Sequence, residues 1–162
     1  MTKQLLSTLL TTILVLTVSH SAYSGLGQNI FQLFGKKVPE LTPVQHQLTI
    51  PVSTFDDGKA HHFKVKAADG IMVTFFALKS KDGIIRAAID ACDVCYRSGK
   101  GYKQEGDYMV CQNCGQKFSS NKINEIKGGC NPAPLKRTIQ KENLIISMED
   151  INANSWYCKF KS

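Results

Sequence analysis

Four cysteines in two pairs are the residues of this chain best suited to chemistry. They form two Cys-x-x-Cys motifs, Cys92–Cys95 and Cys111–Cys114, with fifteen residues between them. Each motif places two thiolates on one tight turn, so both sulfurs can reach the same metal centre. Two such turns supply four ligands, the number that a zinc ion or an iron–sulfur cluster requires. The doubled motif therefore indicates a metal site or a redox site.

The spacing leaves three kinds of site open. The first is an iron–sulfur centre, and the second is a zinc-stabilised binding module, because zinc ribbons use the same spacing. The third is a thiol–disulfide protein in which one motif is the active dithiol. A redox Cys-x-x-Cys usually opens a helix, whose N-terminus stabilises the thiolate. Cys92 instead follows a strand-like run, and the neighbouring charge of Asp93 disfavours a thiolate, so the third kind is the least favoured.

The N-terminal residues have the pattern of an export signal. Lys3 precedes the apolar stretch 5–18, and Ala22 and Ser24 are small residues suited to cleavage after Ser24. The stretch is shorter than the roughly 20 apolar residues of a spanning helix, although an uncleaved N-terminal anchor is an alternative. Either case predicts an extracytoplasmic protein, in a compartment where disulfides can persist.

The remaining length suits one domain. The chain has 162 residues, and we divide it into a signal peptide or anchor (1–24), a Gly- and Pro-containing linker (25–42) and a folded domain (43–162). Within the linker, the apolar residues from Leu26 to Phe34 could form a short amphipathic helix that rests on the membrane surface or packs on the domain, and we favour packing. The net charge of +7 is scattered along the chain rather than clustered, which argues against a nucleic-acid partner.

The folded domain is predicted to be all-β, with short helices. Turns rich in Gly and Asp separate four candidate strands, at 47–52, 61–66, 71–78 and 84–89. Such short turns join antiparallel neighbours, so we expect a meander with the strand containing Phe75 and Phe76 at its centre. In the cysteine region we expect one hairpin element at 107–110 and a short helix capped near Ser119 and ending at Ile126. Residues 144–148 and 156–160 read as closing strands, with a helical turn at 149–153 between them.

The order of loops around the cysteines resembles a Rieske cluster-binding module. Gly115 and Phe118 follow the second cysteine pair as they do in a Rieske loop, and Pro132 and Pro134 lie where the Rieske proline loop covers the cluster. Cysteines replace the two Rieske histidines, at Cys95 and Cys114. The resemblance implies an antiparallel meander joined to a Rieske-like metal-binding subdomain.

The closer resemblance is to the membrane iron–sulfur-containing family called FtrD-like. The segments that carry it lie between about residues 57 and 148 and include Asp90-Ala91-Cys92-Asp93-Val94-Cys95-Tyr96, Gly106-Asp107-Tyr108-Met109-Val110-Cys111 and Gly128-Gly129-Cys130-Asn131-Pro132. It implies a membrane-associated electron carrier, possessing an iron–sulfur cluster of the [2Fe–2S] type held by Cys92, Cys95, Cys111 and Cys114. It also implies partners in ferrous iron uptake, namely a membrane iron permease and periplasmic redox or iron-binding proteins.

Several other residues have two interpretations. Cys130 could be a further ligand, a free thiol, or half of a disulfide with Cys158, which we interpret as structural. His61 and His62 alternate along a strand, so only one of them could face a site, and we expect both them and His46 to face solvent. We interpret Asp90 and Asp93 as turn-forming residues. The tyrosines near the motifs are expected to shield the site: Tyr96, Tyr102 and Tyr108.

Overall fold

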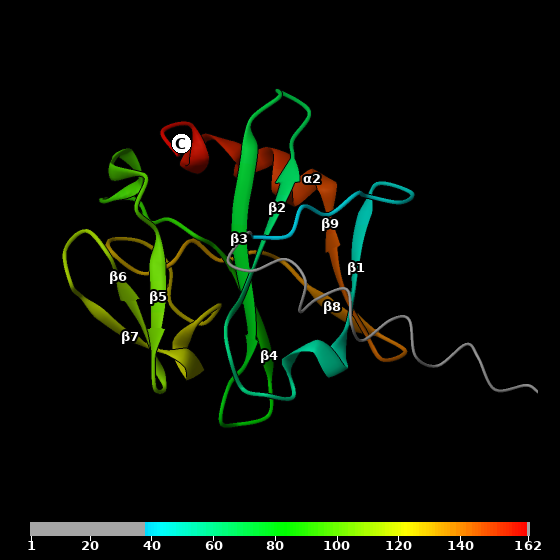
Figure 1. The fold of residues 1–162 in the computed structure, drawn as a ribbon, viewed down its shortest axis with the longest axis horizontal. Coiled ribbons are helices and arrows are strands. Elements are labelled where there is room, and N and C mark those ends of the chain that lie inside the picture. Colours follow the sequence, from blue (N-terminus) through cyan, green and yellow to red (C-terminus); the bar gives the residue numbers. More distant parts are fainter. Residues whose placement is uncertain (1–37, 162) are drawn as a thin grey trace, which may run out of the picture. The chain divides into compact units, whose positions relative to one another are not determined.

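The protein is described here by a computed structural model, which describes residues 38–161 (Figure 1). Nine strands form three antiparallel sheets, ordered β1-β9-β8, β2-β3-β4 and β5-β6-β7. The fold is therefore β-rich, as predicted. The strands are β1 (Gln47–Pro51), β2 (His61–Lys66), β3 (Met72–Lys79), β4 (Ile85–Ile89), β5 (Tyr102–Glu105), β6 (Tyr108–Cys111), β7 (Lys117–Ser119), β8 (Thr138–Gln140) and β9 (Asn143–Ser147). The helices are α2 (Met148–Ala153) and the 3₁₀ turns η1 (Val52–Phe55), η2 (Tyr96–Ser98), η3 (Ser120–Lys122) and η4 (Ser155–Cys158).

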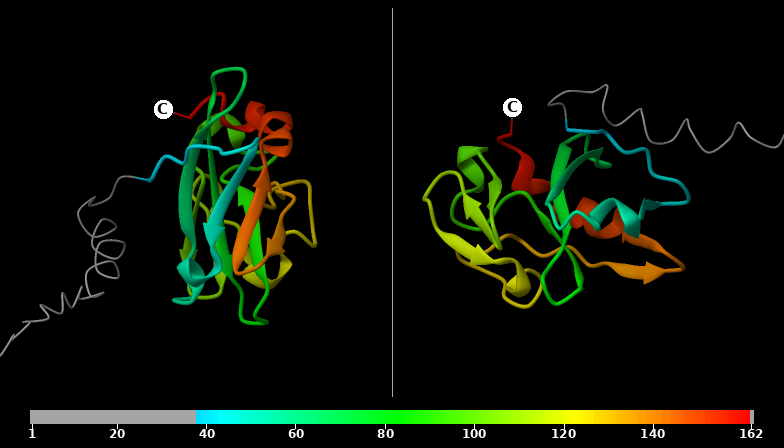
Figure 2. Two further views of the ribbon diagram at one scale, coloured as in Figure 1. Left: turned by 90° about the vertical axis from the view of Figure 1, so that its right-hand side faces the viewer. Right: turned by 60° about the horizontal axis from the view of Figure 1, so that its bottom comes forward.

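The sheet β2-β3-β4 lies between the other two and is the meander that the turns predict (Figures 1 and 2). Gly70 and Gly83 adopt left-handed φ values of 85° and 79° in the two connections, which is why glycine suits these turns. Phe75 of β3 pairs with Phe63 on one side and Ile89 on the other. The prediction that this strand is central is confirmed.

Strand β3 is buried on both faces, and this separates two hydrophobic clusters. Val73, Phe75 and Ala77 belong to the cluster shared with β1, β9 and α2. Phe76 and Leu78, which point the other way, belong to the cluster that contains Cys92 and Cys111. Because successive side chains of a strand point to opposite faces, one strand supports both the core and the cysteine region.

The first predicted strand does not join the meander. Gln47–Pro51 pairs with β9, with Leu48 opposite Ile146. The chain leaves β1 through the 3₁₀ turn η1, whose Phe55 is fully buried, and this turn redirects the chain toward β2. Local turn signals could not reveal that a strand nearly 100 residues later would be the partner of β1.

Three predictions about the C-terminal half are wrong. The cysteine region contains the complete sheet β5-β6-β7 rather than one hairpin element, and the expected helix after Ser119 is only the turn η3. Asn124 ends that segment with a left-handed φ of 71°. The expected strand at 156–160 is instead the turn η4, in which adjacent Tyr157 and Cys158 are both buried, a pattern that an alternating strand does not give.

The predicted signal or anchor (1–24), most of the predicted linker, and the short amphipathic helix lie outside the described residues. The part of the predicted linker that is described, 38–42, packs on the domain: the N–H of Leu41 donates to the carbonyl of Lys64 at 2.7 Å, and Glu40 forms a parallel bridge with Lys64. Among residues 38–161, no helix is long and apolar enough to cross a bilayer.

Candidate metal centre

Three loops bring five cysteines to one place. The first loop follows the buried strand β4 and carries Cys92 and Cys95. The second joins β6 to β7 and carries Cys111 and Cys114, and the third runs from η3 toward β8 and carries Cys130. The sulfurs of Cys92, Cys95 and Cys111 lie within 4.8 Å of one another.

A second group of three sulfurs adjoins the first and shares Cys95 with it. Its other members are Cys114 and Cys130, and the sulfurs again lie within 4.8 Å of one another. The first group is the inner one, because Cys92 and Cys111 are 0% and 2% exposed. The second is the outer one, since Cys114 is exposed and Cys130 half-buried. The five sulfurs thus form an elongated array that runs from the protein interior to its surface.

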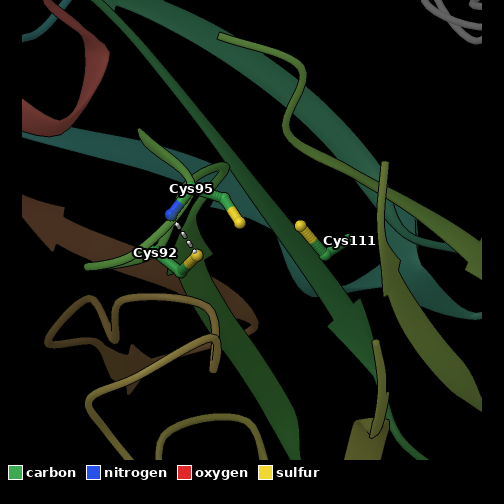
Figure 3. A group of neighbouring side chains, drawn as sticks. All are labelled: Cys92, Cys95 and Cys111. Atoms are coloured by element: carbon green, nitrogen blue, oxygen red, sulfur yellow. Dashed lines mark hydrogen bonds between the residues drawn. The ribbon is translucent and has the colours of Figure 1, made fainter. Parts of the chain in front are cut away.

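The two cysteines of the first motif are held in fixed relation. The backbone N–H of Cys95 donates to the Cys92 sulfur at 3.2 Å, and the Cys95 side chain points toward Cys111 (Figure 3). The turn η2 follows directly and ends at Gly99, whose φ of 67° is left-handed. This is the geometry by which a short, tight turn presents two sulfurs to one centre.

Asp90 fastens the first loop to the second. Its buried carboxylate accepts a hydrogen bond from the backbone N–H of Tyr102 at 2.7 Å and pairs with the ammonium group of Lys161. It lies so close to Gly101 that a Cβ there would come within 2.6 Å of the carboxylate, which leaves room only for glycine. The prediction that Asp90 merely forms a turn is wrong, because its partners are distant in the sequence.

Asp93 also departs from the predicted turn-forming role. Its carboxylate accepts a hydrogen bond from the hydroxyl of Tyr157 in the C-terminal turn η4. Burial and this carboxylate raise the pKa of Tyr157. The first loop is therefore tied to the C-terminal segment as well as to β5.

The second loop is a tight turn at the end of a hairpin. The N–H of Gly115 donates to the carbonyl of Cys111 at 2.9 Å, with Gly115 in the left-handed region. Gln112 donates its N–H to Gly101 and its side-chain amide to Lys100, each at 2.9 Å. The amide of Asn113 reaches across to the Cys95 sulfur at 3.4 Å.

The third loop runs along the edge of β4 and is hydrogen-bonded to it. The N–H of Ile89 donates to the carbonyl of Ala133 at 2.8 Å, and the N–H of Ala133 donates to Ala91 at 2.9 Å. Asn124 clamps the loop, because its side chain accepts from the Ala87 N–H at 2.9 Å and donates to the carbonyls of Ala87 and Leu135 at 2.7 and 3.0 Å. These bonds bring Cys130 to the two motifs from the far side.

A buried arginine supports the same region. Arg86 of β4 donates to the backbone carbonyl of Ile123 at 2.8 Å and pairs with Asp82 and Glu125, each at 2.7 Å. Hydrogen bonds from Ser80 and Arg86 lower the pKa of the Asp82 carboxyl to about 2. The charge on Arg86 is fully paired, so this network fixes the start of the third loop.

The thiols have different acidities. The amide of Asn113 favours the Cys95 thiolate, but burial and the neighbouring thiols of Cys111 and Cys114 outweigh it and raise the pKa of Cys95 to about 12. The backbone N–H of Gln116 instead stabilises the Cys114 thiolate and lowers its pKa. Burial, together with hydrogen bonding to Cys114, raises the pKa of Cys130.

Cys158 lies in a different environment from Cys130. Its sulfur accepts from the N–H of Thr74 at 3.4 Å, and it belongs to the other hydrophobic cluster. All six cysteines lie in the described part of the chain, and none of them forms a disulfide. The disulfide between Cys130 and Cys158 that the sequence left open is therefore not formed, and Cys158 is a core residue.

His46 is exposed as predicted, whereas His61 and His62 alternate as expected but are half-buried. His61 pairs with Asp57 at 3.0 Å and packs on Phe55, on the core side of β2. His62 packs on Phe76, and its buried Nε2 lies 3.6 Å from Asp90 without a hydrogen-bond partner among residues 38–161. Neither histidine belongs to a cysteine group, so the described site has thiol donors alone.

The expected shielding by tyrosines is only partly correct. Tyr102 is buried between the inner sulfurs and the third loop, and its hydroxyl donates to the carbonyl of Cys130. Burial and the nearby Cys92 thiol raise the pKa of Tyr102. Tyr96 covers the first loop and packs on Trp156 and Tyr157. Tyr108 is 47% exposed at the opposite end of β6 and shields nothing in the site.

Sequence reasoning missed the residues that position the loops. Asn124, Tyr157 and Lys161 lie outside every motif, and each binds a residue 37 to 71 positions away: Ala87, Asp93 and Asp90. The only local signal is the Asn at 124, a residue type that tolerates a left-handed backbone better than most.

Comparison with known families identifies the chain. The model of a family described as "Membrane iron-sulfur containing protein FtrD-like" matches residues 55–157. The chain belongs to this family. The match contains all the cysteines of the two groups, and it confirms the resemblance on which the sequence interpretation rests.

Two further comparisons add little to the family assignment. A search among curated proteins finds no match. Among solved structures, the quaternary ammonium Rieske monooxygenase CntA in complex with an inhibitor is similar, with 14% sequence identity and a TM-score of 0.41. That similarity covers 62% of this FtrD-like chain and 30% of the monooxygenase.

The donor set fits the iron–sulfur group that the family name implies. Thiolates are the ligands of iron–sulfur clusters and of structural zinc. Four thiolates on one tetrahedral zinc would lie about 3.8 Å apart, since each Zn–S bond is about 2.3 Å. The described sulfurs form two groups of three that share Cys95, so the five thiols together are more than one tetrahedral zinc takes.

Proposed function

We propose that this FtrD-like protein is an extracytoplasmic one-electron carrier that assists ferrous iron uptake. The observation that carries the proposal is the array of five sulfurs from three loops, buried at one end and exposed at the other. A bound iron–sulfur cluster supplies reversible one-electron transfer. Cys92 and Cys111 would hold it at the buried end, and Cys95 and Cys114 would hold it near the surface.

The residues around the sulfurs serve binding and exclusion of water rather than substrate chemistry. Tyr102, Phe76 and Met109 pack against the inner cysteines and keep solvent from them. The exposed end leaves a short path for an electron between the centre and a partner protein. These features favour a carrier over an enzyme with its own substrate.

All-thiolate ligation sets the expected redox behaviour. With no histidine in either sulfur group, the reduction potential should lie near the plant-type value of about −400 mV and depend little on pH. Nearby lysines raise the reduction potential less than their number in the sequence suggests, because the charges of Lys103 and Lys117 both pair with Glu105.

The link to iron transport comes from the family resemblance. Oxidation of each ferrous ion releases one electron, and a carrier of this kind accepts electrons one at a time. The partners we propose are a membrane iron permease and periplasmic redox or iron-binding proteins. Residues 1–24 would act as a signal peptide or anchor, and residues 25–42 as the linker that holds the domain near the membrane.

The test is an anaerobic preparation of the full chain with its own N-terminal segment. We expect iron and acid-labile sulfide in the protein, visible charge-transfer bands, and a one-electron reduction detected by electron paramagnetic resonance. A colourless protein with one bound zinc would overturn the proposal in favour of a zinc module. A metal-free protein with its motif cysteines oxidised would favour a thiol–disulfide protein.

The role in iron uptake needs a separate test in cells. In the native host, replacing the wild-type gene with a Cys92→Ser variant should reduce uptake of radioactive ferrous iron while the protein remains in the extracytoplasmic fraction. Unchanged uptake with a stable variant protein would separate the electron carrier from iron transport.

A further inference from the structure

The outer end of the metal centre holds one thiol more than a four-thiolate cluster uses. Five sulfurs form the two groups, whereas all-cysteine [2Fe–2S] and [4Fe–4S] clusters each take four. We propose that Cys130 is a ligand that competes with Cys114 for one position, so that either thiol completes the set of four. The inference rests on the proposed function, because it assigns the ligands of the same centre.

Three of the five cysteines are fixed in place. Cys92 and Cys111 are almost fully buried. Cys111 ends β6, and Cys92 lies in the loop that follows β4. Cys95 belongs to both sulfur groups and accepts a hydrogen bond from Asn113 at 3.4 Å. These three sulfurs therefore form the constant part of the ligand set.

Cys114 and Cys130 are alternatives for the remaining position. Both sulfurs lie within 4.8 Å of the Cys95 sulfur and of each other, and both belong to the outer group only. They come from different loops, so the backbone of one loop does not dictate which of the two sulfurs binds. Because both sulfurs lie close to the Cys95 sulfur, they can compete for the position beside it.

The third loop leaves the Cys130 side chain free to take or leave that place. Gly128 and Gly129 precede it with left-handed φ values of 92° and 61°, and a Cβ at Gly129 would meet nothing within 4 Å. Tyr102 holds the backbone carbonyl of Cys130, not its sulfur. The sulfur can therefore change direction by rotation about its side-chain bonds while the loop remains in place.

Competition between two thiols gives the centre a reserve ligand. When Cys114, the more exposed of the two, is alkylated or oxidised, Cys130 still completes the four thiolates. The protein with its centre loaded then has one free thiol in the outer group, and that thiol is sometimes Cys114 and sometimes Cys130.

The direct test is thiol labelling of the loaded wild-type protein under anaerobic conditions. N-ethylmaleimide followed by peptide mass spectrometry should find about one label per protein, divided between Cys114 and Cys130, because bound thiolates are protected. Cys158 is 2% exposed and should remain unlabelled until the protein is denatured. Label at Cys130 alone would make Cys114 the permanent ligand, and label at Cys114 alone would make Cys130 permanent; either result overturns the proposal.

Substitutions provide a second measurement. Cys114→Ser and Cys130→Ser should each retain bound iron and sulfide within about twofold of wild type, whereas the double variant should lose them at least about tenfold. In each loaded single variant, the remaining outer cysteine should be protected from N-ethylmaleimide. A wild type without iron and sulfide would refute the proposed function, whereas a loaded wild type with loss of the centre in only one of the single variants would refute the competition alone.

Discussion

The two Cys-x-x-Cys loops have the same spacing but unequal support. In both, the first cysteine is buried, and the second lies nearer the surface. The first loop follows β4, whose five residues are all buried, whereas the second is the turn of the hairpin between β6 and β7. The two motifs thus place their first sulfur inside and their second sulfur nearer the surface, although different strands hold the two loops.

The first loop is held from several sides, and the second mainly by its own turn. Asp90 binds β5, and Asp93 binds η4. The carbonyl of Ala91 accepts a hydrogen bond from the third loop. The second loop relies on the bond from Gly115 to Cys111 and on two donors of Gln112. The difference between the two loops shows that the spacing of the motif determines which sulfur faces inward. Contacts with distant residues determine how rigidly the loop is held.

The largest expected effect is the loss of an inner ligand. Cys92→Ser and Cys111→Ser should each reduce bound iron and sulfide at least about tenfold, because no spare thiol lies in the inner group. Iron and sulfide analysis of anaerobically purified protein measures this. Cys158→Ser is the matched control, since it removes a buried thiol outside the site. Equal loss in the control would mean that folding, not ligation, had failed.

Removing the clamp on the third loop should have the next largest effect. Asn124→Ala removes three hydrogen bonds worth about 1 kcal/mol each and places alanine at a positive φ. We expect the free energy of unfolding of the reduced, metal-free protein to fall by about 4 kcal/mol, with about 3 kcal/mol from the hydrogen bonds and about 1 kcal/mol from backbone strain. Urea denaturation measures the change.

Two variants make this prediction specific to the clamp. Asn124→Gly tolerates the positive φ and should recover only the part of the loss that is due to backbone strain, about 1 kcal/mol. Asn121→Ala, at a side chain whose Oδ1 has no partner among residues 38–161, should change the stability by less than about 0.5 kcal/mol. A neutral Asn124→Ala would show that the third loop is held by its backbone bonds alone.

The pH dependence of metal binding should distinguish the second cysteines of the two motifs. A thiol must lose its proton to bind a metal, so each proton released makes affinity rise about tenfold per pH unit. The pKa of Cys95 is raised to about 12, so its thiol carries a proton throughout the physiological range and contributes to the slope. The pKa of Cys114 is lowered, so its thiol loses its proton at a lower pH and then adds nothing more to the slope.

Cobalt(II) titrations of metal-free protein between pH 6 and 9 would measure these slopes. Cys95→Ser should flatten the dependence of affinity on pH over this whole range. Cys114→Ser should flatten it less, because a thiol with a lowered pKa loses its proton at a lower pH. Identical slopes in the two variants would contradict the unequal acidities of the outer thiols.

The smallest predicted effect concerns the hydroxyl of Tyr102, which joins β5 to the third loop. Tyr102→Phe keeps the buried ring but removes the hydrogen bond to the Cys130 carbonyl, and should cost about 1 kcal/mol of unfolding free energy. Tyr108→Phe is the matched control, because its exposed side chain lies outside the site. Comparable losses in both variants would assign the effect to the strands rather than to the loop contact.

Much of the site could be predicted from the sequence because its information is local. Two Cys-x-x-Cys motifs at close spacing identify four of the five thiols that the structure brings together, and the Gly–Asp turns identify the meander and its central strand. The family match over 55–157 agrees with the segments that carried the resemblance. Predictions failed where the partner was distant: β1 pairs with β9, and Asp90 binds Lys161 instead of its own turn.

By itself, the sequence determined the four motif thiols, their order along the chain and the antiparallel strands that precede them, because each depends on residues within a few positions. Only the tertiary structure decided that Cys130 joins the outer group, that Cys158 does not, and that Asn124 and Asp90 hold the loops together. The physical reason is that these placements depend on chain segments that approach one another only when β3 is buried on both faces.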